Sequence, residues 1–288
     1  MSDLAVLKNS GLLADCEQCF GLCCVALPYA KSADFASNKD GGTPCSNLTG
    51  DYRCGIHSGL REKGFRGCTV YECYGAGQKV SQITYAQKSW KVDSVHAKEM
   101  FELFPIMQQL HEMMYYLHEA LELERTRDIH SELRHMLSET EALTFLHPDV
   151  IFAIDLAAHR TKVNELLLEA SRLVRSLVML GRMNKPKQEG KGKEKRKQRK
   201  GTDFIGAKLK GISLSGESLR GALFIACDLR NADLSFTDLI GADFRDADLR
   251  GATLTGSLFL TQAQLNAANG DRTTKLPSAL KHPEHWPK

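Results

Sequence analysis

A five-residue period in the last third of the chain constrains the fold more than any other feature of this 288-residue sequence. Every fifth residue from Phe204 to Phe259 is leucine or phenylalanine, at twelve positions in all. The residue two places before each of them is small at ten of the twelve positions, as in Ala232-Asp233-Leu234. Strict repetition of this kind is typical of stacked repeats, in which neighbouring units share one continuous core.

The repeated unit is alanine, then aspartate or asparagine, then leucine or phenylalanine, and it resembles the pentapeptide-repeat family over residues 202–261. The resemblance implies a right-handed quadrilateral β-helix with one pentapeptide on each of its four sides. If one coil takes twenty residues, Phe204, Phe224 and Phe244 fall into one column. Coils at a strand-like spacing of about 4.8 Å would stack these rings, which predicts about three coils around an aromatic column.

The pattern also predicts a hydrogen bond inside the coil stack and a cap at its end. One inward column is polar, with Glu217, Thr237 and Ser257, and we expect the Thr237 hydroxyl to donate a hydrogen bond to the Glu217 carboxylate. A stacked solenoid exposes an apolar cross-section at each end. A short helix near 262–268 is therefore expected to cap the last coil, together with three later apolar residues. These are Leu276, Leu280 and Trp286.

The outward positions of the repeats differ from side to side. Lys210, Arg230 and Arg250 form a basic ladder on one side. Asp228 and Asp248 lie on the same side, so we expect mutual salt bridges there. Two other sides are apolar and are predicted to contact the helical region or a partner protein. Their residues are Ile205, Leu223 and Ile225 on one side, and Ile240, Leu258 and Leu260 on the other.

Eight of the nine cysteines gather near the N-terminus and predict a metal site. They are Cys16, Cys19, Cys23, Cys24, Cys45, Cys54, Cys68 and Cys73. In the opening C-x2-C pair, two thiolates come from one tight turn and can reach the same metal ion. Adjacent Cys23 and Cys24 are expected to point in different directions, so either two sites exist or one of the pair is spare. All-cysteine sites suit zinc and iron–sulfur clusters alike, which leaves the metal undecided.

Residues 16–73 resemble the zinc- or iron-chelating cysteine-cluster family, known as YkgJ-like. That family shows a C-x2-C-x2-C-C block, then a cysteine before a short hydrophobic stretch, then C-x-I-Y and a late cysteine. Three features depart from the pattern: the first block has one extra residue, His57 replaces the usual tyrosine, and no Arg-Pro precedes Cys68. The resemblance implies a bound metal or cluster, and some family members are tied to modification of protein side chains.

Residues 90–183 are predicted to be helical. Apolar residues recur at spacings of three and four over 101–121, and again over 151–180. The second helix is expected to begin near Pro148–Asp149, with a shorter helix around 129–143 between the two. Two long apolar faces with a short connection predict an antiparallel helical hairpin.

One face of the first predicted helix is rich in polar residues. His111, Tyr115, His118 and Glu122 recur there at spacings of four, three and four. Such a set could form a metal or acid–base cluster. A polar face exposed to solvent is the more common reason for this pattern, and it is the interpretation we favour.

The pattern divides the chain into four regions of a multi-domain α+β protein. A cysteine-rich module (1–89) precedes the helical hairpin (90–183), a basic linker (184–200) and the repeats with their cap (201–288). The linker carries nine basic and two acidic residues. Nucleic acid could bind there, but a basic run without interleaved aromatic residues is more often a flexible connector.

The location of the protein also follows from what its sequence contains. No run of about 18 apolar residues occurs, which predicts no membrane-spanning helix. The first residues lack the basic-then-apolar pattern of a secretory signal, so we expect a cytoplasmic protein. Cysteines in that reducing compartment favour metal ligation over disulfides. Unrelated buried thiols are the remaining alternative.

These features favour a protein-binding adaptor that holds zinc or an iron–sulfur cluster. An alternative is a metal- or cluster-dependent enzyme that modifies a protein or peptide, with Cys23 or Cys24 as the labile ligand and His57 nearby. No nucleophile–base pair or phosphate loop supports that alternative. Gyrase-binding mimicry of DNA is a third function known among pentapeptide-repeat proteins. The repeats carry eight acidic and six basic residues, and a net charge of −2 gives too weak a field for it.

Overall fold

The protein divides into two compact units, Met1–Leu167 and Leu168–Lys288, which are considered separately below. The structure is a computed structural model that describes residues 7, 10–92, 94–183 and 203–287. The predicted linker at 184–200 therefore lies outside the described residues. Among the described residues, no helix is both long and apolar enough to cross a membrane.

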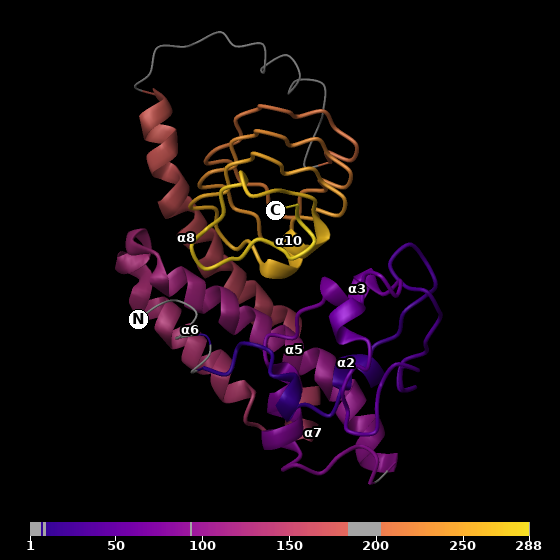
Figure 1. The fold of residues 1–288 in the computed structure, drawn as a ribbon. Coiled ribbons are helices and arrows are strands. Elements are labelled where there is room, and N and C mark those ends of the chain that lie inside the picture. The colour runs from indigo at the N-terminus through magenta and orange to yellow at the C-terminus, as the bar shows by residue number, and fades with distance from the viewer. Residues whose placement is uncertain (1–6, 8–9, 93, 184–202, 288) are drawn as a thin grey trace. The chain divides into compact units, whose positions relative to one another are not determined.

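The cysteine-rich part of the first unit consists of loops held by short helices (Figure 1). These are η1 (Cys16–Gln18), α2 (Leu22–Val25), η2 (His57–Gly59), α3 (Arg66–Thr69), α4 (Ala76–Gln78) and the π-helical η3 (Lys79–Thr84). Their apolar side chains do not form a core of their own. Leu22, Val25 and Val80 pack in one cluster with Met100 and Phe104 of α5 (Ser94–Glu122). The cysteine-rich residues before position 90 and the helices after it thus bury their apolar side chains in the same hydrophobic core.

The remaining helices of the first unit pack around α5. They are η4 (Glu124–Ile129), α6 (His130–Leu143), α7 (Pro148–Phe152) and the first turns of α8 (Leu156–Met183). Helix α6 confirms the shorter helix predicted at 129–143. The single helix predicted from Pro148 onward is wrong, because the chain leaves helical geometry between α7 and α8. The Asp155 carboxylate accepts the Ala158 N–H at 2.9 Å and so caps a new helix start.

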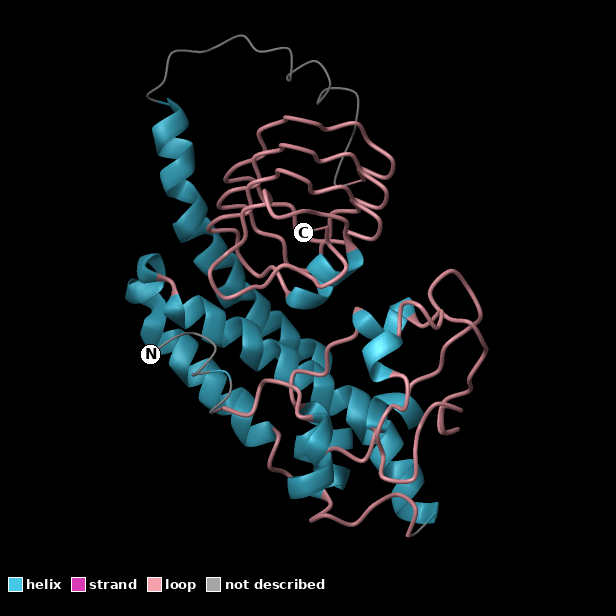
Figure 2. Cartoon of the chain, in the orientation of Figure 1, coloured by secondary structure: helices cyan, strands magenta, loops and turns pink. Residues whose placement is uncertain are grey.

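The second unit confirms a coil of twenty residues. Isolated parallel bridges pair Asp203 with Leu223, and Leu223 with Asp243, and the other three sides show the same register. Figure 2 draws these coils as loops, because each side touches the next coil through a single bridge. The phenylalanine column is also confirmed, because the ring centroids of Phe204 and Phe224 lie 4.9 Å apart and those of Phe224 and Phe244 lie 5.1 Å apart.

The polar inward column does not form the predicted hydrogen bond. The Thr237 hydroxyl donates to the carbonyl oxygen of Leu234 at 2.6 Å, within its own repeat. A hydroxyl has one proton to donate, so the predicted donation to Glu217 is wrong. Thr237 is fully buried. Its hydroxyl therefore finds its acceptor in the backbone carbonyl three residues earlier, whereas the sequence pattern predicted the Glu217 side chain as the acceptor.

The predicted cap is confirmed. Helix α10 (Gln262–Ala267) begins with a capping box between Thr261 and Gln264. The Gln264 amide also donates to the carbonyl oxygens of Leu239 and Ala242, at 2.9 and 2.8 Å. Three later apolar residues complete the end of the core. Trp286 is buried there, and Leu276 and Leu280 pack beside it.

Candidate metal centre

The backbone around α2 brings three cysteine-bearing segments together. Leu22 and Val25 face the core, and Cys23 and Cys24 lie between them on the same short helix. The N–H of Cys45 donates to the carbonyl oxygen of Cys24 at 2.8 Å. An antiparallel bridge between Leu48 and Cys54 then holds Cys54 beside the same loop.

Gly21 makes this approach possible. Its φ of 67° lies in the left-handed region, where a side chain is strained. A Cβ placed there would lie 2.8 Å from a methyl carbon of Leu48 and 3.0 Å from the carbonyl oxygen of Tyr52. Only glycine lets the later loop cross so close to the start of α2.

The adjacent thiols of Cys23 and Cys24 lie close together. Their sulfur atoms are 3.9 Å apart, so the expectation that the two side chains point in different directions is wrong. Two sulfurs bound to one tetrahedral zinc at about 2.3 Å would be separated by about 3.8 Å. The pair therefore has the spacing of two ligands on a single metal ion.

An inner group of thiols surrounds Gly77. A Cβ on this glycine would lie 2.7 Å from the Cys19 sulfur and 4.0 Å from the Cys73 sulfur, so both thiols lie over its backbone. Cys19, Cys23 and Cys73 all pack against the core of the first unit. Burial raises the pKa of the Cys73 thiol to about 11, so in the metal-free protein this group is protonated at neutral pH.

An outer group contains Cys24, Cys45, Cys54 and Cys68. Burial, together with the charges of Cys24, Cys54 and Cys45, raises the pKa of Cys68 to about 11. Burial likewise raises the pKa of Cys54, with Cys24 and Cys45 as its thiol neighbours. The Cys45 sulfur lies 3.2 Å from the Tyr29 hydroxyl oxygen. Mutual repulsion among these thiols means that the group gains from any cation that binds in its midst.

Exposed Cys16 lies at the edge of the two groups. Burial of its sulfur raises the pKa of this thiol, and the charges of Cys19 and Cys24 raise it further. All nine cysteines are free thiols in the structure. His57 is exposed on η2, and its N–H donates to the Cys54 carbonyl oxygen at 3.2 Å.

Buried Lys39 supplies a positive charge beside the outer group. Its ammonium donates to three backbone carbonyl oxygens, of Val25, Asp40 and Thr43, at 3.0, 3.1 and 3.0 Å. The hydrogen bond from Cys23, together with the Lys39 charge and against the effect of burial, lowers the pKa of Cys24 to about 7. Lys39 thus ties its own loop to the end of α2 and favours the thiolate of Cys24.

We expect Lys39→Met to lower the free energy of unfolding by about 1–3 kcal/mol, because three backbone carbonyl groups, that of buried Val25 among them, lose their donor. Thermal unfolding followed by circular dichroism measures this loss. Lys98→Met is the matched control, because the Lys98 side chain is 82% exposed and makes only a 3.9 Å ion pair with Glu102. Equal stability of the two variants would contradict the proposed role of Lys39.

The thiols gather in one region without a finished coordination sphere. Across the part of the chain that the structure describes, no three His, Cys, Asp or Glu side chains are close enough to hold a metal ion together. Soft thiolate donors suit zinc and iron–sulfur clusters, and the Cys23–Cys24 spacing fits such a group. A bound metal would therefore have to draw the remaining thiols inward.

The polar face predicted on the first helix is partly buried, so its interpretation as a solvated face is wrong. His111 of α5 is only 3% exposed, and its Nδ1 lies 2.8 Å from the Tyr74 carbonyl oxygen. This contact makes Nδ1 the protonated nitrogen, because a carbonyl oxygen can only accept. The Nε2 atom is buried and has no hydrogen-bond partner among the described residues.

Sequence reasoning missed the tyrosines that flank Cys73. Tyr71 and Tyr74 come from the loop between α3 and α4, and both are at least partly buried. The Tyr71 hydroxyl oxygen is buried and has no hydrogen-bond partner among the described residues. The available signal was the short run Tyr71-Glu72-Cys73-Tyr74, in which aromatic residues surround a candidate ligand.

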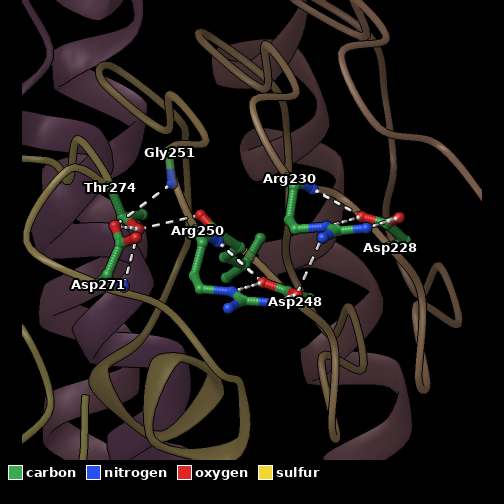
Figure 3. A network of polar contacts seen from close by, with 8 residues as sticks. Asp228, Arg230, Asp248, Arg250, Gly251, Asp271 and Thr274 are labelled. Carbon is green, nitrogen blue, oxygen red and sulfur yellow. Dashed lines mark hydrogen bonds and ion pairs between the residues drawn. The ribbon is translucent and has the colours of Figure 1, made fainter. Parts of the chain in front are cut away.

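The basic ladder on the repeats is neutralised within the coil stack (Figure 3). The Arg230 guanidinium donates two hydrogen bonds to Asp228, both at 2.8 Å, and lies 3.7 Å from Asp248. Arg250 pairs with Asp248 at 2.9 and 2.6 Å. The hydrogen bonds from Arg230 lower the pKa of Asp228 to about 2. For these two arginines, the prediction of mutual salt bridges is confirmed.

Comparison with known proteins supports the repeat unit and extends the likeness to the whole chain. A model of the family "Pentapeptide repeats" matches residues 218–256 with eight copies. The uncharacterized protein YybG of Bacillus subtilis (strain 168) is 59% identical over 275 residues, covering 96% of this chain and 95% of that protein.

Solved structures of pentapeptide repeat proteins are similar to part of the chain. Rfr23 from the cyanobacterium Cyanothece 51142 is 32% identical with a TM-score of 0.24, over 26% of this chain and 50% of that protein. A pentapeptide repeat protein from Nostoc Pcc 7120 is 30% identical with a TM-score of 0.15, over 31% of this chain and 84% of that protein.

Proposed function

The chain is a pentapeptide-repeat protein and belongs to the same family as the Bacillus subtilis protein YybG, and from this premise we propose that it is a metal-binding adaptor. Its N-terminal cysteines would hold zinc or an iron–sulfur cluster, and its repeats would offer a rigid surface to a protein partner. The observation that carries the proposal is the Cys23–Cys24 pair, whose sulfurs lie 3.9 Å apart.

The electrostatics of the thiols support metal binding. Burial raises the pKa of Cys68 and of Cys73, with neighbouring charges, to about 11 each, so these two thiolates are unfavourable without a cation. Metal binding replaces those protons and removes the repulsion between sulfurs. Because the Cys23 and Cys24 sulfurs have the spacing of two ligands on one ion, the pair would join the inner and the outer group in one centre.

The surface of the repeats supports protein binding over nucleic-acid binding. Ile205 and Leu223 are 48% and 37% exposed and lie on the same side of adjacent coils. Arg230 and Arg250 are already paired with aspartates. A side with exposed apolar residues and neutralised charge is better suited to a protein than to a polyanion. The proposed enzyme and DNA-mimic alternatives stay predictions.

Metal content tests the proposal. Full-length protein purified under reducing, oxygen-free conditions should contain stoichiometric zinc or iron by elemental analysis, and bound iron–sulfur would add a broad visible absorption band. A Cys23→Ser/Cys24→Ser variant should lose most of that metal, because it removes one ligand from each group. Cys227→Ala is the matched control, since Cys227 is a buried cysteine of the repeat core.

The control should retain wild-type metal content. A folded wild-type protein that contains neither metal, and takes up neither zinc nor iron when these are supplied, would refute the metal-binding proposal. Equal metal content in the double variant and the wild type would show that the Cys23–Cys24 pair is not the binding site.

A further inference from the structure

The Cys23–Cys24 pair has a geometry that permits chemistry besides metal ligation. Its sulfur atoms lie 3.9 Å apart, and neither side chain is fully buried. The two residues are neighbours on the short helix α2, so no distant segment has to move to bring their sulfurs together. A small reagent from solvent can therefore reach two thiols that already lie side by side.

The backbone holds this pair from both sides. Gly21, the N-cap of α2, has left-handed backbone angles, and its carbonyl oxygen accepts the Cys24 N–H at 2.9 Å. The Cys24 carbonyl oxygen accepts the Cys45 N–H at 2.8 Å. One residue later, the Val25 carbonyl oxygen accepts a hydrogen bond from the Lys39 ammonium at 3.0 Å. The backbone of Cys24 is thus coupled directly to the loop that carries Cys45.

We propose that Cys23 and Cys24 are a redox pair, which hydrogen peroxide converts into a reversible disulfide that releases the backbone contact with Cys45. This inference goes beyond the proposed metal-binding function and does not depend on it, because the reaction needs the two thiols and the peroxide alone. A disulfide uses both sulfurs, so the oxidised pair would no longer be available as two ligands for one ion.

The reaction balances with peroxide as the oxidant. The thiolate of one cysteine attacks a peroxide oxygen, so an S–O bond forms, the O–O bond breaks, and the departing hydroxide takes a proton to become water. The other thiol then attacks the oxidised sulfur, so the S–S bond forms, the S–O bond breaks, and a second water leaves with the proton of that thiol. Two electrons pass from the sulfurs to the peroxide, and the protein loses two hydrogen atoms.

A disulfide between neighbouring residues should be easily reduced. Consecutive Cα atoms lie about 3.8 Å apart, whereas disulfides usually join Cα atoms roughly 4.4–6.8 Å apart. Closing the S–S bond therefore strains the backbone of α2, and strained disulfides are the labile ones. The torsion angles between the two cysteines must change, which moves the Cys24 carbonyl oxygen away from the Cys45 N–H.

Peptide mapping of the full-length protein tests the proposal. Reduced protein is treated with peroxide in the presence of a chelator, its remaining thiols are alkylated, and chymotrypsin then cuts after Phe20 and Tyr29, which separates the pair from the other cysteines. We expect the peptide 21–29 without alkyl groups and lighter by two hydrogen atoms, and dithiothreitol should restore both thiols. In protein unfolded by urea beforehand, this product should become a minor one, because Cys16 and Cys19 then compete for the oxidised sulfur.

Hydrogen exchange measures the coupling to Cys45. After oxidation, the Cys45 amide should exchange about five- to tenfold faster, because it loses the hydrogen bond to the Cys24 carbonyl oxygen. Cys23→Ser is the matched control, since it can be oxidised at Cys24 but cannot close the ring. Its Cys45 amide should exchange at the same rate before and after peroxide.

Each outcome decides one part of the inference. Recovery of the peptide 21–29 with both cysteines alkylated, at a peroxide concentration that oxidises other thiols of the folded protein, would overturn the redox pair. A disulfide from Cys23 or Cys24 to another cysteine would overturn it as well. Unchanged exchange of the Cys45 amide in the oxidised wild type would overturn the coupling. A wild-type protein that forms the disulfide but binds no metal would reject the proposed function and leave this inference intact.

Discussion

Replacing Phe224 by alanine is expected to lower the free energy of unfolding of the repeat unit by about 3–5 kcal/mol. Phe224 is fully buried, and its ring lies between those of Phe204 and Phe244 at centroid distances of 4.9 and 5.1 Å. Truncation removes both stacking contacts and leaves a cavity inside a rigid coil stack. A solenoid coil contacts only the coils next to it, so the loss of stability falls on the contacts between the Phe224 coil and its two neighbours.

Fluorescence of the buried cap residue Trp286 measures this change. The chain has two tryptophans, and a Trp90→Phe background leaves Trp286 as the reporter for the second unit. Leu223→Ala is the matched control, because Leu223 precedes Phe224 in the chain and is 37% exposed. The Leu223→Ala substitution should lower the free energy of unfolding by less than about 1 kcal/mol. A similar loss in both variants would mean that the aromatic column does not hold the coils together.

The repeat unit could be predicted almost completely from the sequence, for a physical reason. Each side of a coil meets the next through the residue twenty positions later, so register and core follow directly from the period. Phe224 could be assigned a stacking partner without knowing the structure. The cap was also predictable, because Thr261 and Gln264 form a capping box that short-range sequence specifies.

The polar interior was less predictable, because short-range backbone acceptors compete with side chains. Thr237 donates to the Leu234 carbonyl oxygen, which is nearer along the chain than the carboxylate of Glu217. The same competition separates α7 from α8, where the Asp155 side chain caps a new helix start inside a continuous apolar pattern. The periodicity of apolar residues predicts which residues are buried, but it does not predict where a helix ends.

The eight cysteines as metal ligands stay a prediction, and their surroundings could not be predicted from the sequence. Cysteine spacing identifies thiols that a turn can bring together, as with Cys19 and Cys23. The contact of His111 on α5 with the carbonyl oxygen of Tyr74, the residue after Cys73, joins residues 37 positions apart. No local pattern encodes such a contact, so His111 was assigned to a solvated face.

Lowering the pH from about 6.5 to 4 is expected to remove about 3 kcal/mol of stability from the first unit through His111 alone. Burial, with a smaller contribution from the Lys79 charge and against the hydrogen bond to the Tyr74 carbonyl oxygen, lowers the pKa of His111 from 6.5 to about 4. The folded protein therefore excludes a proton that the unfolded chain binds. Stability is complete above pH 6.5, falls as the pH drops through this window, and levels off below pH 4.

Denaturant unfolding at several pH values, followed by the circular dichroism of the helices, gives the free energy of unfolding. Its slope against pH is compared between wild type and His111→Gln. Glutamine can keep a donor near the Tyr74 carbonyl oxygen but cannot bind a proton, so the variant should lose the part of the slope that His111 contributes. The difference between the two proteins isolates His111 from His118 and His159, whose pKa values burial also lowers. His147→Gln is the control, because the His147 side chain is 73% exposed. Parallel stability curves for wild type and His111→Gln would show that His111 is accessible to protons in the folded state, and would contradict the buried, neutral imidazole beside Tyr74.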